Sequence, residues 1–147
     1  MKLNHKEFRI GNLVEYDGRV FEIDSVSEVL PTLNTIEFGI GVVDWNNLKP
    51  IPLTEDWLVR LGGEKLPYHN ILNSIFFKVG RNRIVSVGNV GTPNEMIWLC
   101  QVNATNDKII YDLICLRNYD YDGYTPVHTF QNLIHALTGT ELTLTDK

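Results

Sequence analysis

The chain has 147 residues and a formal net charge of −5, with 44% hydrophobic and 21% charged residues. This composition is typical of a globular protein with a buried core, and it excludes a disordered chain. The acid excess offers no general attraction to nucleic-acid phosphates. Apolar stretches are too short to span a membrane, and the first residues lack the apolar core of a signal peptide, so we expect an intracellular protein.

The first third of the chain predicts a small antiparallel sheet. Apolar and aromatic residues flank Asp17-Gly18, a pair that tolerates the positive φ of a tight hairpin turn. More strand-forming residues follow between 35 and 45, where Gly39 and Gly41 indicate a bend or a bulge. Several short strands so close together are typical of a small barrel, and we predict an SH3-like one.

A short helix is predicted at Thr54–Leu61. The Thr54 hydroxyl can cap its first turn, and Gly62-Gly63 follows as a terminator.

A second helix is predicted at Pro126–Thr138, with Thr125 as its cap and Pro126 at its first position. Gly139 ends it. One apolar stripe runs along it, formed by Val127, Phe130, Leu133, Ile134 and Leu137. The segment "ELTL" that follows is expected to add a last strand.

Between the two helices the sequence predicts an antiparallel meander. "NSIFFKV" and "RIVSVG" flank a turn at residues 80–82, where the two arginines of "GRNR" are expected to be solvated. A turn at residues 106–107 would place Trp98 opposite Cys115 and Cys100 opposite Leu113. Both cysteines then lie on the apolar face, so we expect buried thiols rather than a disulfide or a nucleophile.

The predicted fold class is therefore α+β. A β-rich half, residues 1–52, precedes an α+β unit, residues 53–147, in which the C-terminal helix covers one face of the antiparallel sheet. The two parts form either separate subdomains or one compact unit.

Three stretches carry a resemblance to a known set of proteins. "RIGNLVEYDGRV", "LKPIPLTEDWLVRLG" and "VHTFQNLIHALTGTELT" resemble small uncharacterised proteins encoded in Bacteroidetes genomes, their phages and other mobile elements. That set has no assigned activity, so the resemblance implies a mobile-element context and a cytoplasmic site of action. It implies no catalytic residue. Phe130 stands where the set often has leucine, and residues 66–122 are not matched.

The sequence contains no convincing motif for metal binding or catalysis. His128 and His135 are seven residues apart on the predicted helix, about 10.5 Å along its axis, so they cannot share one zinc ion. The chain has no nucleophile elbow or phosphate-binding loop. We therefore expect no catalytic residue, cofactor or metal ligand, and no enzymatic activity.

The stretch from Asn118 to Gly123 resembles the start of a calcium-binding loop. Thr129, however, stands at position 12, where such a loop needs a bidentate glutamate, and a helix already begins at Pro126. We interpret the stretch as a polar strand-to-helix connection.

By elimination, we predict an accessory protein that binds a host or phage protein. Tyrosine offers apolar area and a polar tip at interfaces, and three tyrosines precede a polar strip on the last helix. The predicted contact residues are Tyr119, Tyr121, Tyr124, His128, Gln131 and His135. The alternative is a nucleic-acid-binding module that uses the SH3-like half, with bases stacked on Tyr16 or Trp45.

Overall fold

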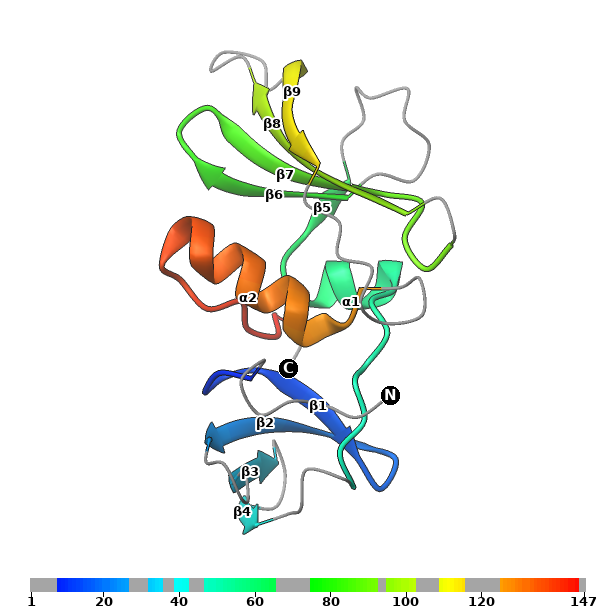
Figure 1. Cartoon of the computed structure of the whole chain (residues 1–147), viewed down its shortest axis with the longest axis vertical. Coiled ribbons are helices and arrows are strands. Elements are labelled where there is room, and N and C mark those ends of the chain that lie inside the picture. Colours follow the sequence, from blue (N-terminus) through cyan, green and yellow to red (C-terminus); the bar gives the residue numbers. More distant parts are fainter. Residues whose placement is uncertain are drawn as a thin grey trace.

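The computed structural model describes residues 8–26, 32–35, 39–42, 47–65, 75–92, 95–102, 109–115 and 125–145. For residues 32–35, 39–42 and 109–115 it describes the backbone alone. Two antiparallel sheets lie at opposite ends of the molecule, with two helices between them (Figure 1). This α+β architecture confirms the predicted fold class.

The first sheet contains β1 (Leu13–Tyr16), β2 (Arg19–Ser25), β3 (Thr32–Thr35) and β4 (Gly39–Val42), paired in chain order. The predicted hairpin is confirmed, because Asp17 and Gly18 have φ of 50° and 74° and Tyr16 pairs with Arg19. A four-stranded meander is compatible with a barrel and with an open sheet alike, so the SH3-like barrel stays a prediction.

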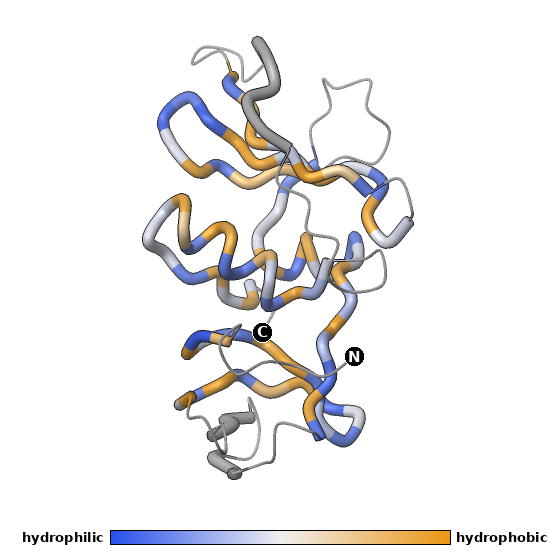
Figure 2. The backbone as a smooth tube through the Cα atoms, in the orientation of Figure 1, coloured by the Kyte–Doolittle hydropathy of each residue, from blue (hydrophilic) through white to orange (hydrophobic). Residues whose placement is uncertain are grey.

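The second sheet is the predicted meander with one added two-residue strand at its edge. It contains β5 (Glu64–Lys65), β6 (Ile75–Gly80), β7 (Arg83–Gly88), β8 (Met96–Val102) and β9 (Ile109–Cys115). Side chains of β6 to β8 are buried on both faces of this sheet. Figure 2 shows these strands as largely hydrophobic.

The predicted register between β8 and β9 is correct at one end only. Trp98 lies opposite Cys115, but Cys100 lies opposite Asp112, because a bulge after Leu99 shifts the pairing by one residue. A second bulge after Gln101 shifts it again. The buried thiol is confirmed for Cys100, which packs with Phe76 and Ile84 on one face of the sheet. The Cys115 side chain lies outside the described residues.

Helix α1 (Glu55–Arg60) begins and ends as predicted. Thr54 Oγ1 accepts a hydrogen bond from Trp57 N at 3.2 Å. At the other end Gly62 has a φ of 98°, and Gly63 N donates to Leu58 O at 2.8 Å. This pattern satisfies carbonyl groups that the last turn leaves open.

Helix α2 (Val127–Thr138) ends at Gly139 as predicted, but its start differs. The expected Thr125 cap is wrong. Residues 125–127 run antiparallel to residues 51–53, with Leu53 N donating to Thr125 O at 2.9 Å, so Pro126 becomes the N-cap. The Thr125 hydroxyl donates instead to the buried carboxylate of Glu95 at 2.7 Å.

The expected last strand at Glu141–Leu144 is also wrong. This segment forms no ladder, and Thr145 N donates to Arg60 O at 2.7 Å, which docks the chain beside α1. The strand-forming residues of this segment led to the prediction of a strand. The backbone just after the segment instead donates a hydrogen bond to the C-terminal end of α1.

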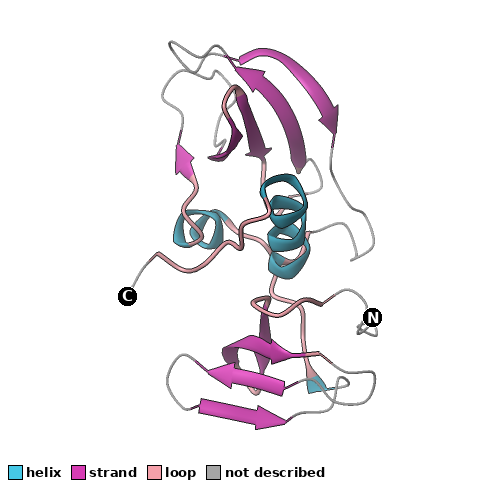
Figure 3. Ribbon diagram, turned by 90° about the vertical axis from the view of Figure 1, so that its left-hand side faces the viewer, coloured by secondary structure: helices cyan, strands magenta, loops and turns pink. Residues whose placement is uncertain are grey.

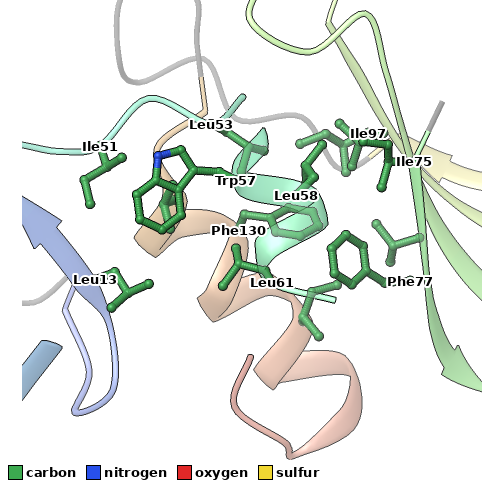
Figure 4. Packing of buried hydrophobic residues seen from close by; sticks show 14 of the residues in the cluster. Leu13, Ile51, Leu53, Trp57, Leu58, Leu61, Ile75, Phe77, Ile97 and Phe130 are labelled. Atoms are coloured by element: carbon green, nitrogen blue, oxygen red, sulfur yellow. The ribbon is translucent and has the colours of Figure 1, made fainter. Parts of the chain in front are cut away.

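Both sheets share one hydrophobic core through the helices. Phe130 of α2 meets Phe77 of β6 with ring centroids 5.1 Å apart, while Leu13 of β1 belongs to the same cluster (Figure 4). Figure 3 shows the helical layer between the sheets from a second direction. The members of the cluster are Leu13, Ile51, Leu53, Trp57, Leu58, Leu61, Ile75, Phe77, Val85, Val87, Ile97, Leu99, Val127, Phe130 and Ile134.

Candidate anion-binding site

The predicted contact residues do not form the expected exposed strip. His128 and Gln131 are fully buried, so their expected exposure is wrong. The reason is that α2 contacts the first sheet as well as the second, and its polar face is covered. His135 is half-buried near the end of the helix.

The remaining part of that prediction lies outside the described residues. This holds for Tyr119, Tyr121 and Tyr124 and for the stretch from Asn118 to Gly123.

Gln131 joins the first sheet to the C-terminal segment. Its Oε1 accepts from Leu13 N at 2.8 Å, and its Nε2 donates to Gly11 O and to Leu142 O, both at 3.1 Å. An amide that uses its oxygen and both N–H groups in this way satisfies three backbone groups that burial would otherwise leave unpaired. Its role is structural.

Nearby polar residues strengthen the same junction. Arg9 forms an ion pair with Glu141 at 2.8 Å, and its Nε donates to Asn132 Oδ1 at 2.7 Å. Asn12 Nδ2 donates to the same Asn132 oxygen at 2.9 Å. The polar face of α2 therefore holds the first sheet in place.

His128 lies in the same junction but in an apolar setting. Its ring is stacked at 4.4 Å from the ring of Phe8. Burial lowers the pKa of His128 from 6.5 to about 4, because an imidazolium would lose its hydration there. The imidazole is therefore neutral at neutral pH.

The described charges do not make the first sheet basic. Residues 8–26 carry two arginines against four carboxylates. Partial burial, together with the negative charges of Glu141 and Asp24, raises the pKa of Glu22. Tyr16 packs edge-on against Phe21, with ring centroids 5.8 Å apart. A phosphate chain would meet net negative charge on this part of the sheet.

An open, polar hollow lies at the opposite end of the molecule, at the turn between β6 and β7. Its volume is about 360 Å³, and Figure 2 shows the turn as a hydrophilic stretch at the upper left. The residues that line it are Val79, Gly80, Arg81, Asn82, Arg83 and Gln101.

Strand pairing holds the backbone of this hollow. Gly80 pairs with Arg83 across the turn, and Arg83 pairs with Gln101 on β8. Val102 N donates to Asn82 O at 2.8 Å, which extends the β7–β8 ladder into the turn. Side chains directly opposite each other on paired strands lie about 5 Å apart at Cβ, so Arg83 and Gln101 project side by side.

The two charged residues that line the hollow, Arg81 and Arg83, are both positive. Between Glu64 and Glu95 the sequence contains no acidic residue, while it contains two lysines and two arginines. Within the described part of the chain, the guanidinium groups of Arg81 and Arg83 have no hydrogen bond or ion pair. By contrast, Arg9 is paired with Glu141 and Lys65 with Glu55.

Two arginines without a partner among the described residues, in a protein with a net charge of −5, make this hollow the candidate site. The interpretation of "GRNR" as a solvated turn is confirmed, because residues 81–82 form a turn and both arginines are exposed. That interpretation did not single out the turn as a site. The gap in acidic residues is visible in the sequence and could have indicated the site, whereas the pairing of Arg83 with Gln101 requires the strand register.

No protein-family model, curated protein or solved structure matches the chain. The resemblance to a mobile-element family therefore stays a prediction. Among the residues that the structure describes, no helix is long and apolar enough to cross a membrane. The same residues contain no group of three or more His, Cys, Asp or Glu side chains that could hold a metal ion.

Proposed function

We propose that the chain is a non-enzymatic accessory protein that binds a host or phage protein, with the β6–β7 turn as its contact point. One observation carries the proposal: two arginines that have no partner in the part of the chain that the structure describes line an open hollow in a protein with a net charge of −5. Arginine is enriched at protein interfaces, where its planar donor group recognises carboxylates. The phage or mobile-element context comes from the sequence resemblance alone.

Charge distribution supports a protein partner over a nucleic acid. Nucleic-acid affinity comes from several phosphate contacts along a basic track. Here the cations Arg9 and Lys65 already neutralise acidic side chains of the chain itself. A single basic hollow instead suits one acidic group on a protein surface.

The alternative, a nucleic-acid-binding module that uses residues 1–52, has less support. Residues 8–26 are acidic in sum, and Tyr16 is partly buried and packs against Phe21. Stacking on aromatic side chains needs free ring faces near positive charge.

Affinity capture from host lysate, with and without nuclease, tests the proposal. The wild type is compared with the double variant Arg81→Glu/Arg83→Glu and with the control Arg19→Glu/Lys49→Glu, which makes the same change in net charge on the first sheet and next to it. We expect a nuclease-resistant protein partner that the wild type and the control retain and the hollow variant loses. A partner that disappears with nuclease would refute the protein-binding function.

A further inference from the structure

We infer that the hollow at the β6–β7 turn is a carboxylate-binding subsite, which takes an aspartate or glutamate side chain from an acidic segment of the partner protein. The inference rests on the proposed function, and it adds the chemistry of the ligand. It is carried by the donors that line the hollow, by the charge around it and by its size.

The hollow offers hydrogen-bond donors. Arg81 and Arg83 each present up to five N–H groups and no acceptor. Asn82 also lines the hollow, but its Oδ1 is a buried acceptor without a hydrogen-bond partner among the described residues, so the two arginines supply the donors. A lining of this kind selects an acceptor with negative charge.

The charge around the hollow indicates one oxyanion rather than a chain of them. Beyond the hollow, Lys65 and Arg9 are paired with acidic groups, and the Arg60 guanidinium lies 4.3 Å from the centre of the Trp57 ring. Lys78 on β6 also has an interaction within the chain, so on the described strands β6 to β8 no further free cation continues the two arginines into a basic track. One carboxylate can be held by a guanidinium fork in two parallel hydrogen bonds.

The size and shape of the site suit a side chain with its flanking backbone. A volume of about 360 Å³ exceeds that of one carboxylate group and leaves space for the peptide that carries it. The paired strands β7 and β8 set the spacing of Arg83 and Gln101 before the ligand arrives. Such preorganisation limits the ordering that binding requires.

Fluorescence anisotropy with a fluorescein-labelled peptide of alternating glycine and glutamate, ten residues long, tests the inference. Three further labelled probes separate the sources of negative charge: the same peptide with glutamine in place of glutamate, a phosphoserine peptide with a single phosphate, and a ten-nucleotide oligothymidine. The proteins are the wild type, Arg81→Gln/Arg83→Gln and the control Arg19→Gln/Lys49→Gln. Thermal unfolding of each variant confirms that it is folded.

We expect the wild type and the control to bind the glutamate peptide, and the hollow variant to bind it at least about tenfold more weakly, as the loss of a charged bidentate contact implies. In the wild type, NMR signals of the Asn82 side-chain amide should shift on addition of the glutamate peptide. Equal binding by the hollow variant would overturn the inference, and so would tighter binding of the phosphoserine peptide or of the oligonucleotide.

The outcome is distinguishable from failure of the proposed function. If affinity capture recovers a nuclease-resistant protein whose binding does not depend on Arg81 and Arg83, the binding function stands and the carboxylate subsite fails. If capture depends on nucleic acid, it is the proposed protein-binding function that fails.

Discussion

Protonation of His128 should destabilise the fold in mildly acidic solution. The ring is fully buried beside Phe8, and its pKa is lowered from 6.5 to about 4. Above pH 6.5 the imidazole is neutral in both the folded and the unfolded chain. As the pH falls below 6.5, the unfolded chain takes up a proton that the folded chain does not. The free energy of unfolding therefore falls until about pH 4, below which both states are protonated.

The size of the effect follows from the displacement of the pKa. At about 1.4 kcal/mol per pKa unit, a change from 6.5 to about 4 corresponds to at most about 3 kcal/mol. Most of that lies in an accessible range, since the loss between about pH 7 and about pH 5 is about 2 kcal/mol. This is a large fraction of the stability of an ordinary domain.

Urea unfolding followed by tryptophan fluorescence, repeated between about pH 7.5 and pH 4.5, measures this loss. The variant His128→Phe keeps a ring against Phe8 and removes the titrating group. The control His135→Gln removes an imidazole from a half-buried place on the same helix. We expect the dependence on pH to be about 2 kcal/mol shallower in His128→Phe than in the wild type and in His135→Gln. The same dependence in all three proteins would refute the account of His128.

Three further substitutions test the junctions of the fold by the same unfolding measurement. Gln131→Met leaves one buried and two partly buried backbone groups without their partner, so a loss of about 2–3 kcal/mol is expected, and a near-neutral result would contradict its structural role. Gly63→Ala would bring a Cβ to 2.5 Å from the Ile75 side chain and should cost about 1–3 kcal/mol, whereas the control Gly80→Ala meets nothing closer than 3.8 Å. Thr54→Ala removes the cap of α1 and should lower the free energy of unfolding by about 1 kcal/mol. An unchanged free energy of unfolding would show that the cap does not stabilise the fold.

The local elements were predictable because their signals are local. The Asp17-Gly18 turn, the Thr54 cap and the end of α1 each depend on backbone conformations that few residues adopt. The order of β6 to β9 in the second sheet followed from the hairpin turns that the sequence predicts between β6 and β7 and between β8 and β9.

The burial of the polar face of α2 was not predictable in the same way. The sequence shows one apolar stripe on the helix, and a polar face opposite such a stripe normally meets water. Here the first sheet covers it, and Gln131 satisfies the backbone at Gly11 and Leu13, more than a hundred residues away. Nothing in the spacing of residues along the helix indicates that second contact.

Two smaller errors, the Thr125 cap and the register between β8 and β9, also come from features that the local sequence does not show. Thr125 has the right chemistry for a cap, but pairing with residues 51–53 keeps it extended and brings it to Glu95. The register between β8 and β9 fails after the first pairs because bulges leave little trace in a sequence. The candidate site was missed for a related reason, since its arginines were interpreted without the strand that lies beside them.

The central claim is that the β6–β7 hollow is the place where a partner protein binds. The most direct measurement is an NMR titration of the wild-type chain, labelled with ¹⁵N at arginine, with the protein recovered by affinity capture. The account predicts that the Nε–Hε signals of Arg81 and Arg83 shift on binding, while the signals of Arg19 and Arg60 stay in place. Unchanged signals for Arg81 and Arg83 in a saturated complex would contradict it.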